Sequence, residues 1–358
     1  MVPTFRITQN DNDITAGIAE RLESLTVSDQ IGWGADSMTL ILHDAAGDLD
    51  IPRRGARLKL YLGYEGQPLA LMGEYSVDRV SVDGPPDRVT IQCAGAALMD
   101  ADGDELAWQT KKSRSWEPLE LGTVVDTIAG EHGVTANVSY TARLTVLPHM
   151  DQDAESDIQF LQRICQDRNM VLKVNVSTLV VMTRNEEPLD GLTITPEDVT
   201  TWSFDFGNRL RYNRVVTVYH SDRDAAQIEC TAGTGAVEYR HLQIFATEID
   251  AQGAANGYLA SFQRGGATFS FTLPGRTDIQ ADTVLTLDGF ARVSLNGGGW
   301  RVENVEHKID SGGYSITVSG TNRNSLDAEP ATDNGFEGLS EDGGEAITDN
   351  DGREPITT

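Results

Sequence analysis

The sequence predicts a mainly β protein with an α+β insert, and three observations support this prediction. Short stretches of alternating apolar and polar residues, separated by Gly, Pro and Asp turns, fill residues 1–95 and return after residue 206. Residues 96–205 instead carry apolar residues at helical spacing. An alternating hairpin in the first segment also has a counterpart of the same design near the C-terminal end, 225 residues later.

The repeated hairpin is Gly73–Gly95, in which two alternating strands flank the turn Gly84-Pro85-Pro86. At the constant offset of 225 residues, the matched pairs are Tyr75 with Trp300, Val77 with Val302, Val80 with Val305, Ile91 with Ile316, Cys93 with Val318 and Gly95 with Gly320. Alternation alone makes any two half-buried hairpins look alike. Duplication is therefore a hypothesis, and it predicts equivalent inward positions for Val77 and Val302 and for Ile91 and Ile316.

Residues 1–95 are expected to form a compact sheet of short strands, as in a barrel or a sandwich. Arg57–Tyr64 (RLKLYLGY) is the clearest strand. Ile14–Val27 alternates only loosely, and its centre of Ala, Glu, Arg and Leu also suits a helix. Residues 206–325 are expected to form a second sheet module, crossed by a helix between about residues 247 and 264.

The insert between these modules, residues 96–205, is expected to be a small α+β domain. Leu119–His132 shows the apolar spacing of one helix face. A second helix, Asp157–Arg168, follows Ser156 and has Gln159 in the third helical position, which together form a capping-box pattern. A short alternating hairpin then completes the domain.

The composition describes an acidic globular protein. The chain has 358 residues, enough for two or three domains, and a net charge of −27. Such acidity argues against holding nucleic acid through its phosphates and favours solubility. We see no secretory signal and no run long enough to span a membrane, and three widely spaced cysteines indicate no disulfide framework. The tail, residues 326–358, holds ten acidic residues and one basic residue and is expected to be disordered.

A search for catalytic and metal-binding motifs finds none, so we predict no catalytic residue, no metal, no cofactor and no enzyme. The six histidines are scattered and are interpreted as surface or capping residues. Two acidic runs, Asp100–Glu105 and Asp349–Gly352, resemble calcium loops but lack the spacing of the later ligands. A carboxylate pair for glycoside hydrolysis stays open, because separation in space decides that chemistry.

Three tryptophans are candidate interface anchors. Trp33 is flanked by glycines, and Trp108 and Trp116 bracket the polar segment Gln109–Ser115. Tryptophan is favoured at the centre of protein interfaces. The alternative for each of the three is ordinary burial in the core.

The order of several segments resembles the late control protein D family of contractile-tailed bacteriophages. Its members are baseplate hub proteins related to the N-terminal part of type VI secretion spike proteins. The segments that carry the resemblance are Trp33–Asp44, the stretch from Pro52 to Tyr64, Gly73–Asp78 with its following turn, Asp153–Val174 and Gly299–Gly320. The resemblance covers roughly residues 3–325.

The resemblance implies two tail-tube-like β-barrels, residues 1–95 and 206–325, joined by the α+β domain. It implies a structural hub, located in the virion tail baseplate and assembled in the host cytoplasm. Three chains would form a ring of six barrels, which joins a trimeric central spike protein to the tail tube protein ring. Tape-measure protein and DNA would pass through its lumen, other baseplate proteins would surround it, and the chain itself would bind no membrane.

Three alternatives remain. The same hub architecture serves related tailocins and type VI-like injection systems, and neighbouring genes would distinguish these. A hub-scaffold peptidoglycan hydrolase is an enzymatic alternative, which a zymogram of the purified chain would detect. Exposed tryptophans and Gly-rich turns also fit a carbohydrate-binding β module, for which a glycan array is the test.

Overall fold

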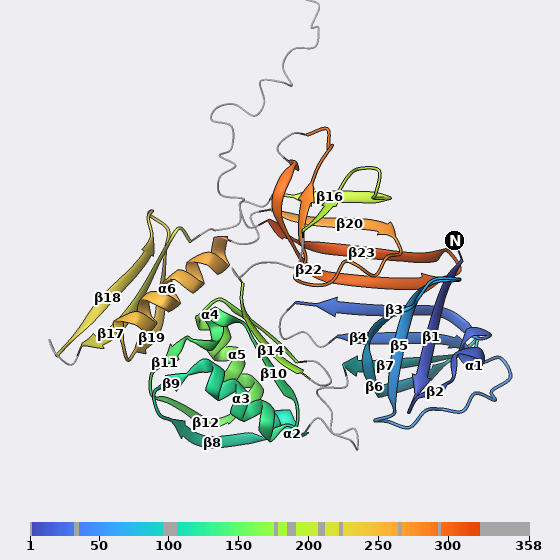
Figure 1. The fold of residues 1–358 in the computed structure, drawn as a ribbon, viewed down its shortest axis with the longest axis horizontal. Coiled ribbons are helices and arrows are strands. Elements are labelled where there is room, and N and C mark those ends of the chain that lie inside the picture. The colour runs from blue at the N-terminus through green and yellow to red at the C-terminus, as the bar shows by residue number, and fades with distance from the viewer. Residues whose placement is uncertain are drawn as a thin grey trace, which may run out of the picture.

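The computed structural model describes residues 2–31, 36–95, 106–174, 178–184, 191–206, 212–221, 225–263, 267–292 and 295–322. The acidic tail, residues 326–358, and both calcium-like runs lie outside these ranges. The described residues form three parts, which we call the sheet body, the middle unit (residues 106–184) and the outer unit (residues 212–263). Figure 1 shows the middle unit between the outer unit and the first-half strands of the sheet body.

The first half of the sheet body contains seven strands and a short helix. They are β1 (Pro3–Gln9), β2 (Asn12–Asp13), α1 (Thr15–Ala19), β3 (Leu22–Gln30), β4 (Ser37–His43), β5 (Arg57–Tyr64), β6 (Ala70–Asp83) and β7 (Arg88–Gly95). Strand β5 has the predicted bounds and buries Leu58, Leu60 and Leu62 on one face, as a period of two requires. The ambiguous segment after residue 14 divides into helix α1 and strand β3.

The second half of the sheet body contributes six strands. They are β15 (Leu192–Ile194), β16 (Thr201–Asp205), β20 (Thr268–Pro274), β21 (Val284–Leu287), β22 (Gly297–Asp310) and β23 (Gly313–Asn322). Strand β22 pairs antiparallel with β3 of the first half, with His307 opposite Val27. The described strands of both halves therefore form one 13-stranded sheet over a single apolar core. Figure 1 shows β3 beside β22, where the two halves meet.

The predicted mainly β class is confirmed, and small helices accompany the strands. The two predicted β-barrels are not detected among the described strands. Within the described residues, the strands of neither half pair into a closed circuit. The path of hydrogen-bonded strands runs from β16 at one edge to β2 at the other and crosses between halves at β22 and β3.

The two long hairpins, β6–β7 and β22–β23, share a β-bulge at the same repeat position. In β6 the ladder is interrupted at Asp78, between Val77 and Arg79, and in β22 it is interrupted at Glu303, between Val302 and Asn304. Asp78 and Glu303 are 225 residues apart. Val77 and Val302 are both fully buried, so their predicted equivalence is confirmed. A bulge is a specific local feature, and its recurrence supports duplication more strongly than alternation does.

The return strands of the two hairpins are shifted by two residues relative to the predicted offset. Ile91 lies opposite Val80, whereas Val318 lies opposite Val305. The counterpart of Ile91 is therefore Val318 and not Ile316, although all three side chains are buried. The cause is the longer turn region of the second hairpin, where two additional residue pairs, Ile309 with Tyr314 and Asp310 with Gly313, extend the ladder.

The middle unit packs helices on a three-stranded sheet of β10, β14 and β13. Its elements are α2 (Leu106–Gln109), β8 (Lys111–Trp116), β9 (Leu119–Glu120), α3 (Leu121–Glu131), β10 (Thr135–Val138), α4 (Tyr140–Arg143), β11 (Val146–Leu147), β12 (Met150–Ser156), α5 (Asp157–Asp167), β13 (Met170–Val174) and β14 (Thr178–Thr183). The predicted capping box is present, since Ser156 and Gln159 bond each other's backbone N–H groups. The buried stripes of α3 and α5 form a separate apolar core with the inner faces of β13 and β14.

The outer unit is a three-stranded sheet covered by one helix. Its elements are β17 (Arg214–Ser221), β18 (Ala226–Gly233), β19 (Glu238–Phe245) and α6 (Glu248–Gln263). It contacts the end of α5 in the middle unit through an ion pair of 2.7 Å between Arg168 and Asp250, and Tyr258 donates a hydrogen bond to Asp167. Gly257 allows close approach, because an added Cβ there would lie 2.8 Å from the backbone oxygen of Asp167.

Candidate functional site

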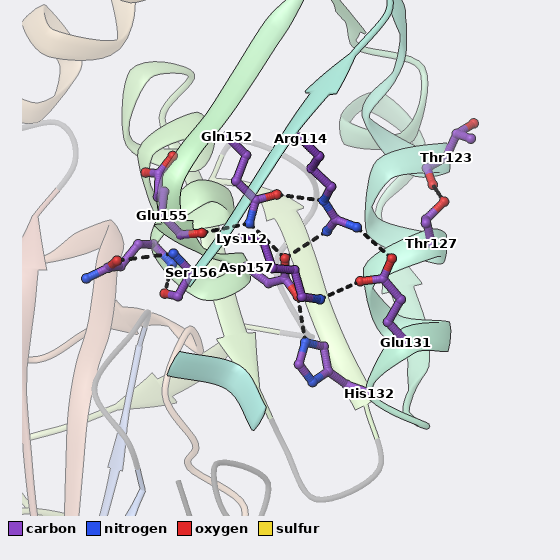
Figure 2. Close-up of polar contacts among 11 residues, drawn as sticks. Lys112, Arg114, Thr123, Thr127, Glu131, His132, Gln152, Glu155, Ser156 and Asp157 are labelled. Carbon is purple, nitrogen blue, oxygen red and sulfur yellow. Dashed lines mark hydrogen bonds and ion pairs between the residues drawn. The ribbon is translucent and has the colours of Figure 1, made fainter. Parts of the chain in front are cut away.

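A buried carboxylate, Asp157, is the centre of the densest polar cluster of the middle unit (Figure 2). Asp157 is the first residue of α5, where an acidic side chain is favoured by the helix dipole and by free backbone N–H groups. Three other elements supply the remaining members of the cluster. Lys112 and Arg114 come from β8, Glu131 and His132 from the end of α3, and Gln152 from β12.

Each oxygen of Asp157 accepts from two side chains. Lys112 Nζ lies 2.5 Å and His132 Nε2 lies 2.8 Å from Oδ2, while Arg114 and Gln152 lie 2.7 and 2.8 Å from Oδ1. The Asp157 side chain is fully buried. These four partners fill its lone-pair directions, as a buried charge requires.

The electrostatic balance keeps Asp157 ionised. Burial by itself raises the pKa of Asp157, but hydrogen bonds from His132, Gln152 and Lys112, together with the Lys112 charge, outweigh burial and hold this pKa well below the usual carboxyl range. Glu131 bridges the outer side of the same two cations, at 2.7 Å from Lys112 and 2.6 Å from Arg114. Two acids therefore neutralise two bases in one network.

The His132–Asp157 pair has the geometry of a general base with an orienting carboxylate. Its surroundings close it to a substrate, because the His132 side chain is only 5% exposed and its ring stacks on Trp108 at 3.8 Å. We therefore interpret the cluster as a structural connection between β8, α3, β12 and α5. Interpreting every histidine as a surface or capping residue was incomplete, since His132 follows α3 as its cap yet is buried, and His307 is buried against the hydroxyl of Tyr314.

The structure describes two of the three predicted interface tryptophans. Trp108 is 3% exposed and belongs to the core of the middle unit. Trp116 is half-buried, with its ring between the Arg114 guanidinium at 4.4 Å and the Phe160 ring at 5.9 Å. Trp33 lies outside the described residues. Burial of Trp108 in its own core leaves little of its ring for a partner, and an interface role for the set stays a prediction.

Two exposed aromatic side chains that sequence reasoning did not select lie at the edge of the sheet body. Trp202 on β16 is 51% exposed and Phe206 just after it is 58% exposed. Phe204 between them packs against the core. The signal was present in the sequence as three aromatics at alternate positions, 202, 204 and 206, which is the pattern of one strand face.

A second polar cluster joins the middle unit to both halves of the sheet body. Lys173 of the middle unit lies 2.5 Å from Asp29 on β3 and 3.2 Å from Asp36 just before β4. The other oxygen of Asp29 accepts a hydrogen bond of 2.8 Å from the backbone N–H of Ala281, in the second half of the sheet body. One carboxylate therefore contacts both halves and the middle unit.

This junction is otherwise loosely packed. Hollows of about 480 and 410 Å³ lie on either side of it, and Asp29, Lys173 and Gln280 line both. Burial raises the pKa of Asp36 to about 6, against the opposing charge of Lys173. The charge cluster therefore helps to position the middle unit on the sheet body, because apolar packing between the two is interrupted at these hollows.

The described residues contain no group of His, Cys, Asp and Glu side chains placed to hold a metal ion. The three cysteines are free and buried, and burial raises the pKa of Cys93 and Cys165 to about 12. Across the same part of the chain, no helix has both the length and the apolar character needed to cross a bilayer.

Comparison with known proteins identifies the family. The sequence profile of the phage tail baseplate hub (GPD) family matches residues 101–313. The chain belongs to this family. It is 28% identical over 363 residues to the probable baseplate hub protein of Escherichia phage 186, covering 88% of this chain and 92% of that protein. The corresponding protein of Escherichia phage P2 is 27% identical over 365 residues, covering 89% of this chain and 92% of that protein.

Solved structures share the fold of this hub family member. The 43 kDa tail protein of prophage MuSo2 from Shewanella oneidensis superposes with a TM-score of 0.68 at 13% identity, over 90% of this chain and 99% of that one. The E. coli c3393 protein, a component of the type VI secretion system, gives a TM-score of 0.53 at 9% identity, over 84% of this chain and 73% of that one. The resemblance found in the sequence is thereby confirmed.

Proposed function

We propose that this chain is the structural baseplate hub of a contractile phage tail and acts by assembly, without catalysis. The observation that supports this function best is the duplicated hairpin with its shared bulge, in a member of the hub family. A chain with two copies of one sheet module presents six modules when three chains associate. Such a ring can meet a trimeric spike on one face and a hexameric tube on the other.

The proposed division follows the sequence prediction. Residues 1–95 form one tube-like module, and residues 206–325 contain the second together with the outer unit (residues 212–263). Residues 96–205 contain the α+β domain, and residues 326–358 form an acidic tail. Strands β15 and β16 lie at the end of the middle segment and complete the second module by pairing with β21 and β20. The partners are two further copies of the chain, the trimeric central spike protein, the tail tube ring, the tape-measure protein and other baseplate proteins.

DNA would pass the hub only in transit. The net charge of −27 disfavours retention of a polyanion in the lumen. The hub would therefore belong to the virion tail baseplate and would be assembled in the host cytoplasm. A related tailocin or type VI-like machine uses the same architecture, and the likeness to the c3393 protein favours this second candidate over an enzyme.

The test is to co-express the chain with the spike protein from the same gene cluster, measure the mass of the complex and average particles along their axis. We expect three hub chains per complex and six similar densities around the axis. A hub that stays monomeric or dimeric with its spike at high concentration would contradict the proposal. A zymogram in which the purified chain lyses cell wall would replace it with the hydrolase alternative.

A further inference from the structure

Among the described strands, the two halves of the sheet body pair with each other at one place, between β3 and β22. Strand β3 pairs antiparallel with the distal part of β22, Asn304–Asp310, beyond the bulge. The two facing side chains at the centre of this contact, Val27 and His307, are each 1% exposed. Strand β3 therefore fills the hydrogen-bonding edge of β22 beyond its bulge, and side chains of both strands are buried on one face.

The corresponding part of β6 has no described partner strand along one of its edges. Strand β6 matches β22 through the shared bulge, and its proximal part is matched too: the N–H of Val77 donates to the carbonyl of Ala56, as that of Val302 donates to Thr283, both at 2.9 Å. Beyond the bulge, β6 pairs with β7 on one side, and no described strand pairs with its other side. Val82, the counterpart of His307, is 58% exposed.

The counterpart of β3 in the second half is β16, and it is also unpaired on one side. Strands β4 and β20 have seven residues each and the same alternation of buried positions, and each pairs with the return strand of its hairpin. On its other edge, β4 pairs with β3 and β20 pairs with β16. Leu25 of β3 lies opposite Leu40 of β4, and Trp202 of β16 lies opposite Phe271 at the same position of β20. The free edge of β16 ends the sheet of described strands, beside the exposed Trp202 and Phe206.

We infer that β16 of one chain pairs antiparallel with the distal part of β6, Arg79–Asp83, in a second copy of this chain. The contact repeats between chains the β3–β22 contact within the chain. Transferring the internal register predicts Val82 opposite Phe204, Ser81 opposite Asp205 and Val80 opposite Phe206. Apolar residues then meet on one face, and polar residues meet on the other.

Two physical arguments support a second copy as the occupant. Exposed edge strands with apolar side chains are templates for pairing and are normally protected or used. The two free edges are also different surfaces, so their contact is heterologous and propagates from chain to chain until it closes. This inference rests on the proposed function for closure at three chains, while the strand pairing itself follows from the internal repeat.

A disulfide cross-link tests the register directly. Ser81→Cys with Asp205→Cys places two thiols on the polar face of the proposed pair, where directly opposed Cβ atoms lie about 4.5–5.5 Å apart. This distance is close enough for a disulfide after a small adjustment. The native thiols are buried and give little background.

The chain provides both matched controls. Ser28 and Glu306 are the internal counterparts of Asp205 and Ser81, and they lie opposite each other in β3 and β22. Ser28→Cys with Glu306→Cys should therefore close within one chain. Ser81→Cys with Thr201→Cys shifts one thiol by four residues along β16, about 13 Å, and should not cross-link.

The readout is a non-reducing gel of the hub–spike complex after mild oxidation, together with the mass of the complex. We expect covalent species of two and three chains from the Ser81–Asp205 pair, a monomeric band without free engineered thiols from the Ser28–Glu306 pair, and no multimers from the shifted pair. A three-chain complex in which only the internal pair forms would overturn this inference and leave the proposed function intact. Cross-linked multimers without any three-chain complex would do the reverse.

A charge on the apolar face gives a second test that needs no cross-link. Phe206→Asp should leave the chain folded, because the side chain is already 58% exposed, and should prevent association with neighbouring chains. Leu242→Asp is the control, since Leu242 is 93% exposed on β19, away from the proposed contact. Equal association of wild type and the Phe206 variant, measured by mass with the spike present, would overturn the inference.

Discussion

The replacement Asp157→Asn tests whether the buried carboxylate holds the middle unit together. The variant keeps the size of the side chain and one acceptor oxygen, which can still face Arg114 and Gln152. Its NH₂ group would take the place of Oδ2 and point donors at Lys112, 2.5 Å away, and at His132, 2.8 Å away. Removing one partner from a buried ion pair typically costs about 3–5 kcal/mol, so we expect a loss of this size.

The assay is urea unfolding of the full chain, followed by tryptophan fluorescence, since Trp108 stacks on His132 beside the cluster. With a slope of about 1–3 kcal/mol per molar urea, the midpoint should fall by at least about 1 M. The control is Glu131→Gln, which removes a carboxylate that contacts the same cations but is 35% exposed, and should cost about 1 kcal/mol or less.

Acidification gives an independent readout of the same charge. Because the folded-state pKa of Asp157 lies below its usual value, its stabilising contribution is present at neutral pH and is lost as the pH falls below about 4. Wild type should lose this contribution and the Asn variant should not. Equal losses from Asp157→Asn and Glu131→Gln would refute the reasoning and would mean that desolvation cancels the attraction in the cluster.

Three further replacements test other contacts. Lys173→Met removes the cation between two carboxylates and should cost about 3–5 kcal/mol, with faster hydrogen exchange at the junction. Lys308→Met, at a 48% exposed side chain, is the control, and equal effects of the two variants would show that Lys173 does not hold the junction. Gly257→Ala should lower the thermal midpoint because its Cβ meets backbone at 2.8 Å, whereas Gly253→Ala meets nothing and should add about 0.5–1 kcal/mol; effects of the same sign would refute this. Burial lowers the pKa of His307 to about 4, so wild type should lose stability as the pH falls from 6.5 to 4, and His307→Gln should lose less; parallel pH profiles would contradict this.

Local signals predicted the helices and strands that depend on neighbouring residues. The period of two in Arg57–Tyr64 and the box formed by Ser156 and Gln159 both appear where the sequence placed them. Such patterns work because a strand face or a helix end is decided by residues a few positions apart. The strands β18 and β19 of the outer unit were not predicted. Strand β19 exposes Leu242 and Ile244 on either side of Gln243 and shows no clean alternation.

The candidate site was predicted less well, because its residues come from separate segments. Lys112, His132 and Asp157 come from β8, α3 and α5, and nothing in the spacing of these residue types distinguishes them from the other acids and bases of an acidic chain. The exposed Trp202 was identifiable in principle from alternation. Its exposure was not, since exposure depends on whether a neighbouring strand covers that edge.

The sequence by itself determined the mainly β class, the family and the repetition of one hairpin, because these depend on local pattern and on the order of segments. Only the tertiary structure decided that β3 pairs with β22, where Ser28 donates a hydrogen bond to Asn304, 276 residues away in the sequence. It also decided the two-residue shift of the return strands β7 and β23. The unpaired edges of β6 and β16 likewise follow only from the tertiary structure. Long-range pairing balances chain entropy against the burial of whole faces, and no short window of sequence contains both partners.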